Sequence, residues 1–270
     1  MSFSEPSGQV AGVSISAFFP AYNDAPSLPG LIERTFKVLN ACASDYEVIV
    51  VNDGSRDGTA VVLANLEAKY HNRLRVVTHE KNLGYGQALR SGFRHATKEL
   101  VFYTDGDGQY DVAELPKLLK KLRRNVGLVN GFKLERNDPR HRVWIGDVYN
   151  RFARALFQIG IRDVDCDFRL IRRSLIEDLC LTSTSGTICV ELVRKLELLE
   201  CGVREVGVHH YPRRYGRSQF FRVRSLAVTL AQLIGLWWRL VLLPRISPRD
   251  PVEAPAAAGL EAPAGAGIEA

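Results

Sequence analysis

The sequence predicts an α/β fold in which a mostly parallel central sheet is flanked by helices. Short apolar runs alternate with segments of helical periodicity through about the first 130 residues. These runs are continuously apolar, which is typical of strands covered by helices on both faces. A polar loop follows each of four of them. Ligands bind in such loops, at the carboxyl edge of a parallel sheet.

The expected elements of the first half follow in chain order. Continuous apolar runs predict strands at residues 13–19, 46–51, 74–78, 100–104 and 126–130. Apolar residues that recur at three- and four-residue spacing predict helices over 27–41, 59–71, 86–97 and 112–124. Strand and helix therefore alternate, as they do in a parallel sheet.

The pattern changes after residue 131. An aromatic-rich helix is expected over 140–160, then a strand at 164–171, a helix at 187–200 and a strand at 203–209. We divide the chain into a flexible N-terminus, one globular domain, an apolar and basic helix, and a tail rich in Pro, Ala, Gly and Glu that is expected to be disordered; these are residues 1–12, 13–222, 223–246 and 247–270.

Composition narrows the class of protein. A chain of 270 residues fits one domain with an appendage, and its net charge of +6 suits a phosphorylated substrate, an anionic membrane or nucleic acid. No nucleic-acid recognition motif is found, so no nucleic-acid partner is expected. Five cysteines without a C-x-x-C pair indicate neither a disulfide framework nor a zinc site. Free thiols fit the reducing cytoplasm.

The strongest chemical signal lies in the loop after the fourth predicted strand. Asp105 and Asp107 are one residue apart, so in an extended chain both side chains point the same way. Two such carboxylates repel each other unless a cation lies between them. Mg²⁺ and Mn²⁺ take oxygen ligands of this kind, together with substrate phosphates. A solvated acidic turn explains the same residues, since Asp and Gly are common in turns.

Three other loops offer polar or aromatic groups at the same edge. Tyr22 presents a stacking face and Asp24 an acceptor, although a simple turn explains both. Asp53 follows the second strand and can accept a hydrogen bond from a base or ribose. Residues 82–92 contain a dinucleotide-like glycine pattern, but Leu89 replaces its third glycine and it follows the third strand, so this match is weak.

Taken together, the motifs resemble one enzyme family. P-A-Y-N-D, N-D-G-S-R-D-G-T, N-L-G-Y-G-Q-A-L-R-S-G and D-G-D-G-Q occur in the order seen in family 2 glycosyltransferases of the GT-A fold. D-F-R-L-I-R-R at 167–173 and Y-P-R-R-Y-G-R-S at 211–218 are similar to the branch of dolichol-phosphate mannosyltransferases and polyprenyl-phosphate glycosyltransferases. The resemblance covers 13–222 and implies one GT-A domain over that range.

This resemblance implies an inverting, metal-dependent transferase that uses a nucleotide-diphosphate sugar of the GDP-mannose or UDP-glucose type. It implies that the nucleotide sugar contacts Pro20, Tyr22, Asp24, Asp53, Gly84 and Asp105. It also implies that Mg²⁺ or Mn²⁺ is bound by Asp105, Asp107 and Gln109, with Asp107 acting in catalysis. The family more often has Glu at position 24.

Two classes of acceptor remain open. A polyprenyl phosphate is already an anion and needs positive charge beside it. The candidate cations are Arg136, Arg169, Arg213, Arg214 and Arg217, of which we place Arg169 in the catalytic group. A sugar or small-molecule hydroxyl needs a carboxylate base instead, for which the candidates are Asp165 and Asp167.

Residues 223–246 predict either an interfacial helix or a buried packing helix. Trp237 and Trp238 with basic flanks are typical of a helix at a membrane surface, whereas Gln232 and Arg239 argue against a membrane span. The sequence therefore predicts a transferase acting on polyprenyl phosphate, in the cytoplasm or peripherally at the cytoplasmic face of a membrane. The alternatives are a soluble transferase acting on a hydroxyl and a catalytically silent nucleotide-sugar-binding protein.

Overall fold

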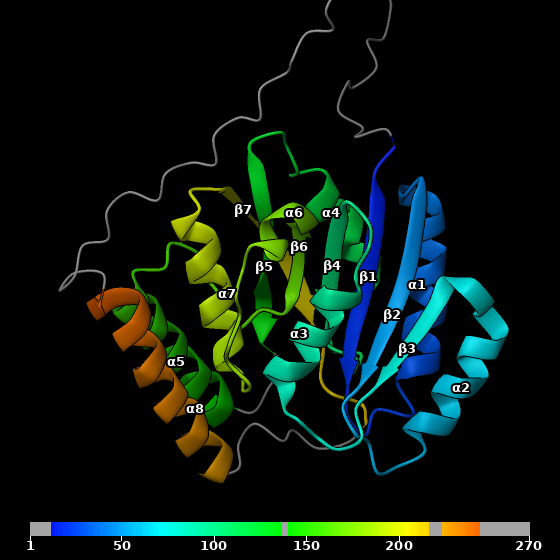
Figure 1. Ribbon diagram of the computed structural model, residues 1–270, viewed down its shortest axis with the longest axis horizontal. Coiled ribbons are helices and arrows are strands. Elements are labelled where there is room, and N and C mark those ends of the chain that lie inside the picture. Colours follow the sequence, from blue (N-terminus) through cyan, green and yellow to red (C-terminus); the bar gives the residue numbers. More distant parts are fainter. Residues whose placement is uncertain (1–11, 137–139, 216–222, 244–270) are drawn as a thin grey trace, which may run out of the picture.

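The computed structural model describes residues 12–136, 140–215 and 223–243. Within these ranges one seven-stranded sheet has the order β3-β2-β1-β4-β6-β5-β7 (Figure 1). β6 runs antiparallel to both of its neighbours, and the other pairings are parallel. This arrangement confirms the predicted α/β fold. The strands are β1 (Ser14–Ala21), β2 (Asp45–Asn52), β3 (Leu74–Thr78), β4 (Leu100–Thr104), β5 (Val126–Arg136), β6 (Phe168–Arg172) and β7 (Gly202–His210).

Helices cover both faces of the sheet. The apolar side chains of α1, α2 and α4 form one core with the strands, and those of α3, α5, α7 and α8 form the other. The helices are α1 (Leu28–Cys42), α2 (Thr59–Tyr70), α3 (Tyr85–His95), α4 (Leu115–Leu119), α5 (Arg140–Phe157), α6 (Arg173–Glu177), α7 (Thr187–Leu198) and α8 (Val223–Trp237). Shorter helical turns are η1 (His71–Arg73), η2 (Val112–Glu114) and η3 (Trp238–Leu242).

The structure differs from the predicted elements in a few places. The helix expected over 112–124 is divided into η2 and α4 and ends at Leu119. The Arg123 guanidinium donates to the carbonyl oxygens of Lys120 and Leu122, which competes with continued helix. β5 continues past residue 130 to Arg136, and α6 was not predicted. The predicted N-terminal segment up to residue 11 and the predicted tail lie outside the described residues.

The loops after β1, β2 and β4 meet at the carboxyl edge, where the strand order reverses beside β1. The amide of Asp53 donates to the Ala21 carbonyl at 2.9 Å, and the amide of Gly106 donates to the Pro20 carbonyl at 3.1 Å. Pro20 cannot donate a hydrogen bond, but its carbonyl still joins two loops. This is the position at which open α/β sheets bind ligands.

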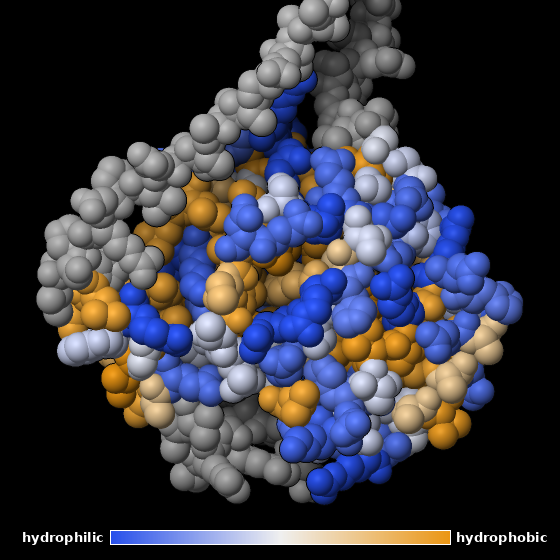
Figure 2. Space-filling model, viewed as in Figure 1, coloured by the Kyte–Doolittle hydropathy of each residue, from blue (hydrophilic) through white to orange (hydrophobic). Residues whose placement is uncertain are grey.

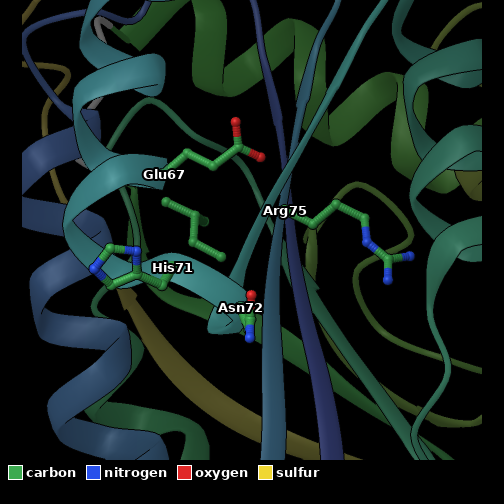
Figure 3. Close-up of a pocket in the computed structure, with 5 residues that line it drawn as sticks. Glu67, His71, Asn72 and Arg75 are labelled. Atoms are coloured by element: carbon green, nitrogen blue, oxygen red, sulfur yellow. The ribbon is translucent and has the colours of Figure 1, made fainter.

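A separate hollow of about 490 Å³ lies between α2 and the start of β3 (Figure 3). Leu74 lies in its lining and is the first residue of β3, so the hollow is at the opposite edge of the sheet from the loops above. The other lining residues are Glu67, His71, Asn72 and Arg75. We assign it no part in the site described next.

Candidate active site

Asp105 and Asp107 lie in the turn that follows the fully buried strand β4. The turn is closed by the Gln109 amide, which donates to Asp107 Oδ1 at 3.0 Å, and Gly108 takes a φ of +76° that favours glycine. Gly106 approaches the Pro20 carbonyl closely, so a Cβ at this position would lie 2.8 Å from that oxygen. The local sequence therefore fixes both carboxylates at the carboxyl edge.

Carboxylates from two other segments, Asp24 and Asp167, lie near this pair. Burial, then the charges of Asp167 and Asp107, raise the pKa of Asp105 well above its ordinary value. Burial also raises the pKa of Asp107. The pKa of Asp24 is raised to about 6, chiefly by burial and further by the charge of Asp107. A site that crowds acidic groups in this way favours a bound cation.

Arg213 supplies positive charge to this carboxylate cluster. Its Nη2 donates to Asp107 Oδ2, and its Nη1 lies 3.9 Å from Asp24 Oδ1. It comes from the segment after β7, more than a hundred residues from Asp107 in the chain. Arg214 is exposed beside it. The structure thus brings Arg213, the first basic residue of the Y-P-R-R segment, to the predicted metal-binding loop.

Gln109 joins the same two loops. The Tyr211 amide donates to the Gln109 carbonyl at 2.8 Å, and Gln109 Nε2 donates back to the Tyr211 carbonyl at 3.0 Å. Two reciprocal hydrogen bonds therefore fix the start of the Arg213 segment to the Asp107 turn. The predicted role of Gln109 as a metal ligand stays a prediction beside this observed contact.

Asp53 is buried and accepts three hydrogen bonds from the protein. The amides of Leu83 and Gly84 donate to its two oxygens at 2.9 and 3.0 Å, and His79 Nδ1 lies 2.7 Å from Oδ1. His79 Nε2 lies 2.8 Å from the Ser91 hydroxyl. Asp53 thereby shapes the loop that contains Gly84, and its predicted contact with the nucleoside stays a prediction. Pro20 is buried in β1 and Tyr22 is half-buried in the next loop.

Tyr85 is a residue of this site that the sequence analysis did not identify. Its hydroxyl donates to Asp105 Oδ1 at 2.9 Å. It is the first residue of α3, and it lies between two glycines of the N-L-G-Y-G segment. Its place in a loop at the same sheet edge was a signal that could have indicated the contact.

Asp167 directly precedes β6 and Arg169 is its second residue, so both lie beside the carboxyl end of the antiparallel strand β4. Arg169 is fully buried and its guanidinium is committed to protein groups: Nε donates to Asn130 Oδ1 at 2.6 Å and Nη2 to the Val164 carbonyl at 2.6 Å. Its Nη1 donates to the Tyr103 hydroxyl and lies 3.2 Å from Asp167 Oδ1. This arrangement orients Asp167 and leaves the guanidinium without access to a substrate phosphate.

Asp165 is placed differently from Asp167. Its charge raises the pKa of Tyr149 on α5, after the larger effect of burial, and its carbonyl accepts from Lys133 Nζ at 2.9 Å. Asp167 instead accepts from the Cys189 thiol at 3.1 Å and faces Asp105. Of the two candidate bases, Asp167 therefore lies beside the carboxylate cluster. The Arg136 side chain and the whole of Arg217 lie outside the described residues.

The donor set at this edge fits a hard divalent cation. In the described part of the chain, no three His, Cys, Asp or Glu side chains are arranged to hold one ion. Asp105 and Asp107 together provide two carboxylates whose pKa values are raised. Mg²⁺ is commonly held by one or two carboxylates, with the remaining positions taken by substrate phosphates and water. The pair fits that mode of binding.

A family profile described as glycosyl transferase family 2 matches residues 16–180, which contain Asp53, Asp105, Asp107 and Asp167. The chain belongs to this family. Undecaprenyl-phosphate 4-deoxy-4-formamido-L-arabinose transferase of Enterobacter sp. (strain 638) is 28% identical over 212 residues, covering 78% of this chain and 64% of that protein. The protein of the same name from Pseudomonas fluorescens (strain SBW25) is 27% identical, covering 79% and 62%. The chain thus spans less than two-thirds of the length of these relatives.

Solved structures support the same fold. Glucosyl-3-phosphoglycerate synthase from Mycobacterium tuberculosis, in complex with Mn²⁺, UDP and glucosyl-3-phosphoglycerate, has a TM-score of 0.65 at 18% identity, covering 88% of this chain and 86% of that one. The same enzyme with Mn²⁺, UDP-glucose and phosphoglyceric acid also has a TM-score of 0.65, at 19% identity over 85% and 80%. The GT-A fold inferred from the sequence motifs is therefore confirmed.

Proposed function

We propose that this family 2 glycosyltransferase moves a sugar from a nucleotide-diphosphate sugar to a polyprenyl phosphate, with inversion at the anomeric carbon. The observation that carries the proposal is the meeting of Asp105 and Asp107 with Arg213 at the switch point of the sheet. Acidic groups suited to a cation and a basic group suited to phosphate lie side by side. Two distant relatives are named as undecaprenyl-phosphate sugar transferases, which favours a lipid phosphate.

In this proposal Asp105 and Asp107 would hold Mg²⁺ or Mn²⁺, which would supply positive charge to stabilise the leaving nucleoside diphosphate. Tyr85 holds the Asp105 carboxylate in place. Arg213 is already paired with Asp107 and is placed to pair with phosphate oxygens. Pro20, Tyr22, Asp24, Asp53 and Gly84 frame the nucleotide.

A polyprenyl phosphate acceptor needs orientation more than it needs a base. Its phosphate is ionised near neutral pH and can attack the anomeric carbon directly. Two anions must then approach each other, so guanidinium groups are needed beside them. We propose Arg136, Arg213, Arg214 and Arg217 for this role.

The decisive experiment is release of nucleoside diphosphate from a panel of donors with Mn²⁺ or Mg²⁺. The panel contains GDP-mannose, UDP-glucose and a nucleotide-linked 4-deoxy-4-formamido-L-arabinose, each with and without a short polyprenyl phosphate. We expect one donor to turn over at least about a hundredfold faster with the lipid phosphate, because most of the reaction rate depends on positioning a second substrate. Equal turnover with and without the lipid would reject this acceptor.

A second candidate acceptor is a sugar or small-molecule hydroxyl. The observation that favours it is Asp167, a carboxylate that lies beside Asp105 and is oriented by Arg169. A hydroxyl must lose a proton during attack, and a carboxylate at this position can accept it. Under this alternative an Asp167→Asn variant loses turnover with hydroxyl acceptors. Turnover with lipid phosphate would depend much less on Asp167.

We also propose that α5 and α8 contact a membrane surface peripherally, near the cytoplasmic leaflet. Both helices pack against α7, and Figure 2 shows apolar surface over α8. The exposed apolar side chains on α5, on α8 and at the start of η3, which follows α8, are Trp144, Ile145, Val148, Phe152, Leu230, Ile234 and Trp238. In the described part of the chain, no helix is long and apolar enough to cross a bilayer. Tryptophan and aliphatic side chains on one surface suit an interfacial contact.

Vesicle co-sedimentation tests this contact. We expect the double variant Trp144→Ser, Trp238→Ser to bind anionic vesicles at least about tenfold more weakly, since loss of two exposed aromatic side chains removes more than the 1.4 kcal/mol that a tenfold change requires. Val61→Ser is the control, because Val61 is 67% exposed, about as much as Trp144 at 68%, but lies on α2. Equal binding by both variants would remove the membrane contact from the proposal.

A further inference from the structure

The segment before α7 is held in a defined conformation by hydrogen bonds to a buried carboxylate. Glu191 of α7 is fully buried, and its oxygens accept from the amides of Thr182 at 3.0 Å and Ser183 at 2.8 Å. Lys195 Nζ lies 2.7 Å from the same carboxylate and compensates its charge. A buried, fully hydrogen-bonded carboxylate of this kind specifies the path of the chain that it binds. The 182–185 segment is therefore a defined part of the fold.

The same segment is held from the other side by Gln232 of α8. Gln232 Oε1 accepts from the Ser185 amide at 3.2 Å and from the Ser185 hydroxyl at 2.8 Å. Its Nε2 donates to the Thr184 hydroxyl at 2.8 Å. The oxygen and the nitrogen of the Gln232 side-chain amide thus bind two consecutive residues. A further contact, from the Thr187 hydroxyl at the start of α7 to the Thr229 carbonyl at 3.2 Å, joins α7 to α8.

The 182–185 segment in turn presses on the start of α3. The Gly86 amide donates to the Thr184 carbonyl at 2.9 Å. A Cβ at Gly84 would lie 2.5 Å from the Thr184 oxygen, and one at Gly86 would lie 2.4 Å from the Ser183 oxygen. These distances leave no room for a side chain at either glycine, so the backbone of the 182–185 segment packs directly against that of the Gly84–Gly86 turn. Any movement of Thr184 must be followed by the Gly84–Gly86 turn.

Tyr85 lies between these two glycines and donates to Asp105. Asp53 fixes the other side of the same turn through the Gly84 amide. The position of the Tyr85 hydroxyl, and through it the Asp105 carboxylate, therefore depends on contacts on both sides of the turn. One side belongs to the nucleotide-binding loops. The contacts on the other side connect the turn through Thr184 to α8, which lies more than a hundred residues further along the chain.

We propose that Gln232 is a positioning residue for the donor site. By fixing Thr184 and Ser185, it sets the Gly84–Gly86 turn and keeps the Tyr85 hydroxyl on Asp105. Helix α8 is then a structural part of the site that binds the nucleotide sugar and not merely an appendage of the domain. Figure 1 shows α8 beside α7 on the α3 side of the sheet, which is the arrangement this coupling requires. The proposal rests on the proposed function for its kinetic consequence, but the coupling itself is independent of it.

The first test measures the coupling without any turnover. In Gln232→Ala, hydrogen exchange of the Gly86 amide is expected to be about tenfold faster than in the unaltered protein, because the three hydrogen bonds that hold Thr184 and Ser185 are lost. Arg239→Ala is the matched control on the same helical segment, since its Nε contact is to its own helix at 3.4 Å. Gln232→Glu keeps the oxygen that accepts from Ser185 and is expected to restore most of the protection.

The second test is kinetic. For Gln232→Ala we expect the KM for the nucleotide sugar and the metal concentration at half-maximal rate to rise about fivefold to tenfold, while Gln232→Glu stays within about twofold of the unaltered enzyme. Unchanged exchange at Gly86 together with an unchanged KM, even with a lowered melting temperature, would overturn the proposal, because Gln232 would then serve only to attach α8. Faster exchange at Gly86 in an enzyme without transferase activity would support the coupling and reject the proposed function separately.

Discussion

Asp107→Asn is expected to lower turnover of the nucleotide sugar by on the order of 10²–10³-fold, in line with the loss of one group that stabilises developing charge. Asparagine has nearly the same shape, and its side-chain oxygen can still accept from the Gln109 amide. The substitution therefore removes the negative charge while keeping the turn. Release of nucleoside diphosphate at saturating donor and metal measures the effect.

The matched control for this experiment is Asp111→Asn in the same loop. Asp111 Oδ1 accepts from the Ala113 amide at 3.0 Å and caps η2, so its role is structural. Asparagine caps helices about as well as aspartate, because its side-chain oxygen can still accept from the Ala113 amide, so turnover is expected to change by less than about threefold. If Asp107→Asn behaved like Asp111→Asn, the metal and leaving-group roles assigned to this loop would be wrong.

Gln109→Glu separates the two roles that Gln109 could have. A carboxylate keeps an oxygen for a metal ion but cannot donate to the Tyr211 carbonyl as Gln109 Nε2 does. If Gln109 acts as a metal ligand, the variant binds the metal ion with the same affinity as the unaltered protein or with a higher one. If its main role is to hold the Arg213 segment, the variant loses activity while its metal affinity is maintained.

Much of the fold could be predicted because its signals are local. Continuous apolar runs marked β1 to β4, and helical periodicity marked α1 to α3, each within a few residues of the observed bounds. The antiparallel insertion of β6 between β4 and β5 could not be read from the sequence, since an apolar run does not reveal which strand it pairs with. The end of α4 could not be predicted either, because it depends on the Arg123 side chain, which donates to a backbone carbonyl just after the helix.

The candidate site, like the fold, could be predicted only in part. The family resemblance implied that the 105–109 loop binds the metal ion and that arginines of the 211–218 segment bind the acceptor phosphate, and in the structure Arg213 pairs with Asp107. The contact between Tyr85 and Asp105 was not predicted, because it depends on how closely the Gly84–Gly86 turn approaches another segment. The full burial of Arg169 was also not predicted, since arginine is ordinarily exposed unless it is paired.

Replacing Arg169 by methionine is expected to destabilise the fold by about 3–5 kcal/mol. The guanidinium is fully buried and donates to Asn130, Tyr103 and the Val164 carbonyl as well as to Asp167. Methionine fills similar space but leaves these acceptors without a donor in a site closed to water. Since each kcal/mol lowers the melting temperature of a chain near this size by about 2–4 °C, the expected fall is roughly 6–20 °C.

Arg173→Met is the matched control for this measurement. Arg173 lies four residues further along and pairs with Glu177 at a partly exposed surface, so its loss is expected to cost about 1 kcal/mol or less. A fall in melting temperature for Arg169→Met no larger than that of Arg173→Met would mean that the buried network does not hold β6 in place.

The double variant Arg169→Met, Asp167→Asn distinguishes an uncompensated charge from hydrogen-bond acceptors that are left without a donor. Breaking a buried ion pair from one side leaves the other charge uncompensated, whereas removing both charges is often much less harmful. If Arg169 mainly compensates Asp167, the double variant recovers stability relative to Arg169→Met. If it mainly satisfies Asn130 and the Val164 carbonyl, no recovery occurs, because those acceptors remain without a donor. The first result would tie the stability of β6 to the same carboxylate that faces Asp105, so that the group best placed to act as a base is also the one that the fold must compensate.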